Sequence, residues 1–231
     1  MNYSRGPEAA GTARQQFGRL VTATTLLLIR HAHTAATDVS LSGRALNVPL
    51  SPLGKEQLRD LCTVLYDVRI DAIYSSPLER ARATAKAIAE RQSLAVHVRD
   101  DLSEVDFGEW TGKTFAELEG TPEWRRYNRY RSTAQIPGGE HPATLAARAT
   151  RALDDIQRVH PGHTVAVVSH AEVIRSAVLR CLRRSLDLYH EIEIPPASIT
   201  EIAFTANGAQ VMSVGRLSDT TAPLVWGLQG K

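Results

Sequence analysis

Five side chains in this sequence have the types that phosphoryl transfer requires: Arg30, His31, Arg80, Glu104 and His170. A neutral imidazole is a good nucleophile toward phosphorus at neutral pH. Arginine neutralises the charge of a phosphate monoester and matches its oxygens with paired hydrogen bonds. A carboxylic acid of raised pKa can protonate a leaving alkoxide. Together these residue types indicate phosphate-ester chemistry in which fixed positive charge stabilises the transition state and no metal is required.

The position of each residue suggests its role. Arg30 and His31 are adjacent, which suggests a phosphate held by the guanidinium and attacked by the imidazole. Arg80 lies in the first turn of a predicted helix, where the helix dipole also favours an anion. A protonated His170 would add another donor to the phosphate oxygens. Glu104, in a loop, is the preferred proton donor for the leaving group.

Short apolar runs predict the strands that position these residues. Residues 26–29 and 164–169 are typical of strands buried on both faces of a parallel sheet, and residues 72–75 and 95–98 are two further short strands. Amphipathic segments between and after them predict helices at 52–66, 77–91, 114–130, 144–159 and 171–182. Ser76 and Glu79 have the spacing of a capping box at the second helix. Because the carboxyl ends of parallel strands meet at one edge, where ligands bind, we expect the candidate residues to converge there.

The end of the sequence predicts a different strand arrangement. Residues 199–205 and 210–214 read as two strands joined around Asn207-Gly208, a strong hairpin signal. The predicted fold is therefore α/β, with a mostly parallel sheet, helices on both faces and a C-terminal β-hairpin at the edge. We expect a flexible N-terminal tail at 1–22, one domain at 23–218 and a C-terminal tail at 219–231.

Composition is typical of a globular protein and argues against some classes of partner. The 231 residues are 43% hydrophobic and 23% charged, with a net charge of +2, which is too small to favour nucleic acid or a membrane surface as a partner. No apolar run approaches the roughly 20 residues that span a bilayer. Cys62 falls on the apolar face of a predicted helix, so we expect a buried free thiol. With Cys181 as the second cysteine, nothing resembles a disulfide framework, and we expect a reducing, cytoplasmic location.

Four motifs in order resemble the histidine phosphatase superfamily, which has the phosphoglycerate mutase-like fold. They are Arg30-His31-Ala32, the segment from Ser75 to Ala81, the acid loop from Leu102 to Gly112, and Val168-Ser169-His170-Ala171. Gly139-Glu140 resembles a further recurrent element before the long helix. The resemblance implies that Arg80 lies in the phosphate pocket, that Glu104 is the proton donor and that the segment carrying His170 supplies the second catalytic histidine. Two residues depart from the pattern: Ala32 replaces the usual glycine, and Thr37 stands where many members place an asparagine that helps hold the phosphate.

The resemblance, with the residues, predicts a metal-independent phosphatase that hydrolyses a small phosphate monoester through a phosphohistidine, without a cofactor. The catalytic residues are His31, Glu104 and His170, and the phosphate-binding residues are Arg30, Arg80, Thr37 and Ala171. The expected partner is a small anionic phosphorylated substrate, and the sequence makes no prediction of oligomeric state. The acid loop resembles the phosphatases more than the mutases, so we favour hydrolysis. The alternatives are phosphoryl transfer of the cofactor-dependent phosphoglycerate mutase type and a phosphate-binding module without catalysis.

Three individual assignments have alternatives. Asp106 or Glu109 could replace Glu104 as the proton donor in the same loop. His33, two residues after His31, could ligate a metal together with other strand-end histidines, although neighbouring arginines would repel a cation. The basic run 123–131 is either a solvated helix or a lid over an anionic substrate, in which Trp124 or Tyr127 would contact the ligand. The remaining histidines are interpreted as structural: His97, His141, His160, His163 and His190.

Overall fold

A six-stranded sheet organises the computed structural model, which describes residues 23–217. Its strands are β1 (Thr24–Arg30), β2 (Ala72–Ser75), β3 (Val96–Val98), β4 (Thr164–Ser169), β5 (Ile199–Thr205) and β6 (Gly208–Arg216). The expected tails, 1–22 and 219–231, lie outside the described residues. The strand order is β3-β2-β4-β1-β5-β6, in which β1 pairs in parallel with β4, and β2 in parallel with both β4 and β3.

The last two strands run as the sequence predicts. β5 pairs antiparallel to β1, and β6 pairs antiparallel to β5 through a turn at Ala206-Asn207, after which Gly208 begins β6, so the hairpin forms one edge of the sheet. The predicted fold, a mostly parallel sheet with a C-terminal hairpin, is confirmed. The register also matters for function. Arg30 at the end of β1 lies opposite Ser169 at the end of β4, and Ser75 of β2 lies opposite Val168, so three strands end at the same level.

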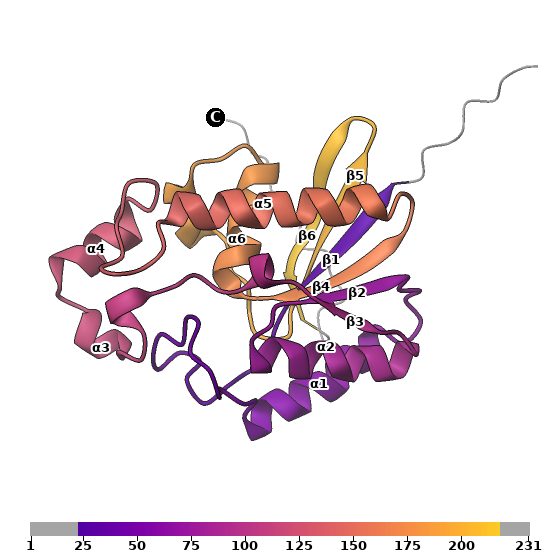
Figure 1. Ribbon diagram of the computed structural model, residues 1–231, viewed down its shortest axis with the longest axis horizontal. Helices are drawn as coiled ribbons and strands as arrows, with labels where there is room; N and C mark the ends of the chain where they lie inside the picture. Colours follow the sequence, from indigo (N-terminus) through magenta and orange to yellow (C-terminus); the bar gives the residue numbers. More distant parts are fainter. Residues whose placement is uncertain (1–22, 218–231) are drawn as a thin grey trace, which may run out of the picture.

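Helices cover both faces of this sheet (Figure 1). The α-helices of the described residues are α1 (Pro52–Val64), α2 (Glu79–Gln92), α3 (Phe115–Leu118), α4 (Pro122–Arg129), α5 (Pro142–Val159) and α6 (Ala171–Cys181), of which α1, α2, α5 and α6 lie on the sheet. One face of the sheet, with Leu26 and Leu28 of β1, packs against α5 and α6. The other face, with Leu27 and Ile29, packs against α1 and α2. Because alternate residues of β1 are buried on opposite faces, its sequence is apolar without alternation.

The predicted helix at 114–130 is wrong, because two short helices occupy this segment. Thr114 and Thr121 cap α3 and α4 with their side chains, and Gly120 between the helices has a φ of +97°. Pro122 follows at the first turn of α4, where its missing N–H costs no hydrogen bond. Figure 1 shows both helices at one end of the molecule, where they belong to a third apolar cluster that includes Tyr127.

Two local expectations meet different outcomes. The capping box at Ser76 does not form: α2 begins at Glu79, Leu78 is its N-cap, and no side chain caps it. Cys62 is a buried free thiol, as predicted, and packs in the cluster beneath α1 and α2. Among residues 23–217, no helix has both the length and the apolar character needed to cross a membrane.

Candidate active site

The ends of β1, β2 and β4 bring the predicted histidines together. The backbone N–H of His31 donates to the carbonyl of Ser169, and that of Ser76 donates to Val168, so each chain leaves the sheet beside its neighbour. The rings of His31 and His170 then meet edge to face, with 5.1 Å between their centroids. His31 is 6% exposed and His170 is fully buried. The convergence expected from the strand pattern is therefore present.

The surroundings of His31 leave one ring nitrogen available as a nucleophile. Its Nδ1 lies 2.8 Å from the carbonyl oxygen of Ala32, which can only accept, so Nδ1 carries the hydrogen. Nε2 is then the unprotonated nitrogen, and it accepts a hydrogen bond of 3.2 Å from Nε of Arg80. Burial, followed by the charges of Arg80 and Arg30, lowers the pKa of His31 well below its usual value. The ring is therefore neutral and its Nε2 lone pair faces the arginine.

Arg30 and Arg80 carry buried donors with no partner in the described part of the chain. Arg80 is 2% exposed and donates through Nη2 to the carbonyl of Gly43 at 2.6 Å, while its Nη1 has no hydrogen bond. Arg30 donates through Nη1 to the carbonyl of Ile194 at 2.7 Å, and its Nε is likewise unpartnered. Buried guanidinium groups rarely leave donors unpaired. These free donors beside His31 suit the oxygens of a bound phosphoryl group.

His170 contributes a further donor through a contact that the sequence did not suggest. Its Nε2 lies 2.7 Å from Oγ of Ser76, and Ser76 Oγ also accepts the backbone N–H of Leu78. When the hydroxyl donates its own hydrogen to Nε2, the ring hydrogen lies on Nδ1, a buried atom without a partner among residues 23–217. Burial, followed by the charge of Arg80, lowers the pKa of His170 well below its usual value. The ring is therefore neutral, contrary to the expectation of a protonated ring, and it still offers one N–H.

Glu104 has the environment expected of a proton donor. It is 8% exposed, and the backbone N–H of Val105 donates to its Oε1 at 2.9 Å. Burial raises its pKa to about 7, the charge of Glu172 acts in the same direction, and Arg80 and Arg148 oppose it. A carboxyl group with a pKa near neutrality can both give and take a proton at physiological pH. The acid role preferred for Glu104 is therefore chemically sound.

A second buried charge cluster lies next to Glu104, and sequence reasoning missed it. Glu172, in the first turn of α6, accepts hydrogen bonds from Nη1 of Arg131 at 2.8 Å and from the hydroxyl of Tyr189. The guanidinium of Arg131 lies between two aromatic rings, 3.7 Å from the centroid of Tyr127 and 3.5 Å from that of Tyr189. Glu172 is thus held by Arg131 and Tyr189, and it is the charge that adds to burial in raising the pKa of Glu104. Its only signal in the sequence was the position two residues after His170.

A cavity of about 300 Å³ lies beside these groups, and His170, which is fully buried, is not among the residues that line it. The predicted residues on its wall include Arg30, His31, Arg80 and Glu104, together with Thr37 and Ala171. The hydroxyl of Thr37 accepts the backbone N–H of Thr34 at 3.0 Å and is also hydrogen-bonded to the hydroxyl of Thr34 at 3.1 Å. Ala171 begins α6, whose N-terminus therefore opens on the cavity.

Helix α4 contributes its inner side to the cavity, and its arginines face solvent. Trp124, Tyr127 and Asn128 line the wall, whereas Arg125 and Arg129 are exposed. The outer side of α4 is therefore solvated, as the first interpretation of the basic run expects. Trp124 and Tyr127, which the lid interpretation names, lie on the cavity wall.

His33 does not reach the cavity. Its Nδ1 is hydrogen-bonded to the hydroxyl of Ser51 at 2.8 Å, and its backbone N–H donates to Gln57. Gly54 at the start of α1 packs so closely on the His33 carbonyl that a Cβ would lie 2.1 Å from the oxygen. Within residues 23–217, no group of three or more His, Cys, Asp or Glu side chains is arranged to hold a metal ion.

Comparison with known proteins gives the family. The sequence profile of the histidine phosphatase superfamily (branch 1) matches residues 26–216, nearly all of the described chain. The chain belongs to the histidine phosphatase superfamily. Its relatives and structural neighbours include several phosphatases, and this histidine phosphatase is accordingly a phosphomonoesterase-type enzyme.

Individual relatives differ in substrate. Phosphoserine phosphatase 1 of Hydrogenobacter thermophilus is 35% identical over 165 residues, which cover 71% of this chain and 77% of that protein. Adenosylcobalamin/alpha-ribazole phosphatase of Escherichia coli is 30% identical over 160 residues, which cover 68% of this chain and 78% of that protein. Bifunctional protein Rv2228c of Mycobacterium tuberculosis is 37% identical over 191 residues, but the match covers only 52% of that longer protein.

Solved structures agree on the fold. YhfR of Bacillus stearothermophilus superposes with a TM-score of 0.79 at 26% identity, covering 84% of this chain and 98% of that one. A phosphoserine phosphatase mutant of Entamoeba histolytica, solved with phosphoserine, gives a TM-score of 0.76 at 27% identity, covering 83% and 96%.

The departure at Ala32 is accommodated in this histidine phosphatase. Ala32 is fully buried, its methyl group lies in the apolar cluster under α1 and α2, and its φ is not positive. Its backbone N–H donates to Oγ1 of Thr84 at 3.1 Å. A glycine is therefore not required by the backbone at this position.

Proposed function

We propose that this enzyme hydrolyses a small phosphate monoester through a phosphohistidine on Nε2 of His31, without a metal ion. The observation that carries the proposal is the state of that nitrogen. It is unprotonated, it is held by the Nδ1 contact to Ala32, and it faces Arg80 beside a buried carboxyl group of raised pKa.

In the first step the Nε2 lone pair of His31 attacks phosphorus in line with the leaving oxygen. The N–P bond forms as the P–O bond to the alcohol breaks, and the carboxyl group of Glu104 gives its proton to the departing oxygen. The unpartnered donors of Arg30 and Arg80 balance the charge on the three remaining oxygens, and the neutral ring of His170 adds an N–H donor. Thr37 and the start of α6 at Ala171 supply further donors on the same wall.

In the second step water replaces the histidine. Glu104, now a carboxylate, takes a proton from water as its oxygen bonds to phosphorus, and the N–P electron pair returns to Nε2. Inorganic phosphate leaves, and both groups are restored to their starting states. A pKa near 7 suits this double duty, because Glu104 must be an acid in one step and a base in the next.

The cavity supports a small substrate with a polar alcohol. Its volume of about 300 Å³ is at the low end of ligand sites, and arginine, glutamate and tyrosine side chains line it. Phosphoserine and alpha-ribazole phosphate, the substrates after which two of the relatives are named, belong to the same chemical class.

The test is hydrolysis of nitrophenyl phosphate in EDTA by the wild type and by His31→Ala, with acid-quenched and alkali-quenched samples examined for phosphoprotein. We expect turnover that survives the chelator, loss of turnover in the variant, and a phosphoprotein that is stable in alkali and labile in acid, as an N–P bond is. Loss of wild-type activity in EDTA would replace this mechanism with a metal-dependent one. Transfer of the phosphoryl group back to an acceptor instead of to water would favour a mutase.

A further inference from the structure

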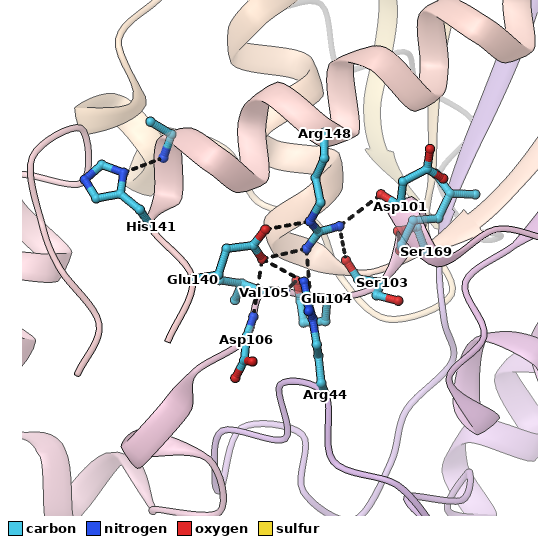
Figure 2. A network of polar contacts seen from close by, with 12 residues as sticks. Arg44, Asp101, Ser103, Glu104, Val105, Asp106, Glu140, His141, Arg148 and Ser169 are labelled. Atoms are coloured by element: carbon cyan, nitrogen blue, oxygen red, sulfur yellow. Dashed lines mark hydrogen bonds and ion pairs between the residues drawn. The ribbon is translucent and has the colours of Figure 1, made fainter. Parts of the chain in front are cut away.

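A saturated polar network lies behind the loop that carries Glu104 (Figure 2). Its centre is Arg148 on α5, which donates five hydrogen bonds and so uses every N–H of its guanidinium. Two of them go to the carboxylate of Glu140, at 2.7 and 2.8 Å. The side chains of Arg148 and Glu140 are 11% and 10% exposed, so the pair is largely removed from water. Such a bidentate pair is geometrically specific and lysine cannot reproduce it.

The remaining bonds of Arg148 hold the backbone of the acid loop. They go to the carbonyl oxygens of Asp101 at 2.9 Å, Ser103 at 2.6 Å and Glu104 at 3.0 Å. Figure 2 shows these carbonyls directed at the guanidinium. The guanidinium thus fixes the backbone by hydrogen bonds on the N-terminal side of Glu104 and at Glu104 itself.

Glu140 holds the backbone on the C-terminal side of Glu104. Its backbone N–H donates to the carbonyl of Asp106 at 2.8 Å, and its Oε2 lies 3.4 Å from the N–H of Asp106. Arg44 approaches from the opposite loop, where its Nε donates to the Glu104 carbonyl at 3.0 Å and its Nη2 to Glu140 at 3.0 Å. The carbonyl of Glu104 therefore accepts from two arginines at once.

The carboxyl group of Glu104 has far less support than its backbone. Among residues 23–217 its only hydrogen bond comes from the N–H of Val105, the next residue in the chain. The direction of the carboxyl group therefore follows the backbone at residues 104 and 105, which the network holds. Arg44 also follows Gly43, whose carbonyl holds Nη2 of Arg80. The same network thus links the loop behind the proton donor to the loop behind a phosphate-pocket arginine.

We propose that Arg148 and Glu140 are positioning residues for proton donation: by fixing the backbone at Glu104, they hold its carboxyl group where the leaving oxygen departs. The proposal rests on the function proposed above, in which Glu104 is the general acid. A displacement of about 1 Å can cost on the order of 100-fold in rate when a reacting group is misplaced. Loosening the network should therefore impair the protonation step and spare the attack by His31.

Two substrates separate these steps. Glycerol phosphate releases a strongly basic alkoxide and needs the proton from Glu104, whereas nitrophenyl phosphate releases a weakly basic phenolate and scarcely needs it. The measured quantity is kcat/KM, which covers the steps up to departure of the alcohol and excludes hydrolysis of the phosphoenzyme. Arg148→Lys keeps the positive charge but loses the planar guanidinium that makes the bidentate pair. Glu140→Gln keeps the size of the side chain but loses its negative charge. Arg158→Lys, on the exposed end of the same helix, is the matched control.

We expect Arg148→Lys and Glu140→Gln to lower kcat/KM on the order of 100-fold for glycerol phosphate and less than about fivefold for nitrophenyl phosphate. Arg158→Lys should change neither. Adding Arg148→Lys to Glu104→Gln should cause no further selective loss, because the group being positioned is gone. Urea unfolding of each variant establishes that it is folded, and Glu140→Gln carries the test should Arg148→Lys not fold.

An equal loss on both substrates would mean that the network only supports the fold, and would overturn the proposal. So would unchanged kinetics, or a further selective loss in the double variant. If Glu104→Gln alone lowered kcat/KM equally for glycerol phosphate and nitrophenyl phosphate, Glu104 would not be the general acid. That outcome would refute the acid role of Glu104 in the proposed function. It is distinguishable from failure of the positioning proposal because it is seen in a variant whose Arg148 is unchanged.

Discussion

The buried carboxyl group of Glu104 should weaken the fold above neutral pH, and Glu104→Gln should restore that stability. Burial raises the Glu104 pKa from 4.5 to about 7. The folded state therefore holds this proton more tightly than the unfolded chain does. The resulting stabilisation is complete below pH 4.5 and is lost as the pH rises to about 7. The difference in pKa corresponds to about 3 kcal/mol in the free energy of unfolding.

Urea unfolding of the wild type and of Glu104→Gln, at about pH 4.5 and about pH 8, measures this term. Glutamine has nearly the same shape, and its amide oxygen can still accept the N–H of Val105. The stability of the variant relative to wild type should rise by about 3 kcal/mol between the two pH values. Glu109→Gln removes an exposed carboxylate from the same loop and is the control. A wild-type-to-variant difference that does not change with pH would refute the assignment of a raised pKa to Glu104.

Two further predictions concern the kinetics. For glycerol phosphate, kcat/KM should fall about tenfold per pH unit above about 7 as Glu104 loses its proton, while His31 stays neutral because burial lowers its pKa; a pH–rate profile that is flat through this range would contradict the acid role. Ser76→Ala removes the 2.7 Å contact to Nε2 of His170, and should lower kcat/KM about fivefold by releasing the ring tautomer. Stopped assays of this variant beside Ser93→Ala, a surface serine replacement after α2, measure that loss, and equal rates for the two would exclude the role of Ser76.

Local pattern was sufficient for the sheet and for the residues at its strand ends. The apolar runs before Arg30 and before His170 predict doubly buried strands, and β1 and β4 are such strands. Strands of this kind end at one edge of the sheet, so the convergence of His31, His170 and Arg80 followed from chain order and topology. Glu104 was preferred as the proton donor from its position in the loop, and the resemblance of four motifs to one family implied the same role.

Local pattern failed where a polar side chain had a choice of partner. Ser76 and Glu79 have capping-box spacing, yet the hydroxyl of Ser76 contacts His170, which is 94 residues away in the chain. The segment 114–130 has helical periodicity, yet Gly120 and Pro122 divide it. In both cases a tertiary contact or a backbone requirement outweighed the local preference.

The sequence alone determined which residue types reach the sheet edge, because strand burial and chain order are encoded in short apolar runs. Only the tertiary structure decided their chemical states. The neutral ring of His31, the raised pKa of Glu104 and the pairing of Glu172 with Arg131 all depend on desolvation and on charges from distant segments. The hydrogen bonds of Arg148 to three backbone carbonyls could not be predicted from the sequence either, because every residue has a backbone carbonyl and no residue type marks these three as acceptors. Electrostatic and hydrogen-bonding terms are set by proximity in space, and proximity between loops exists only after the chain has folded.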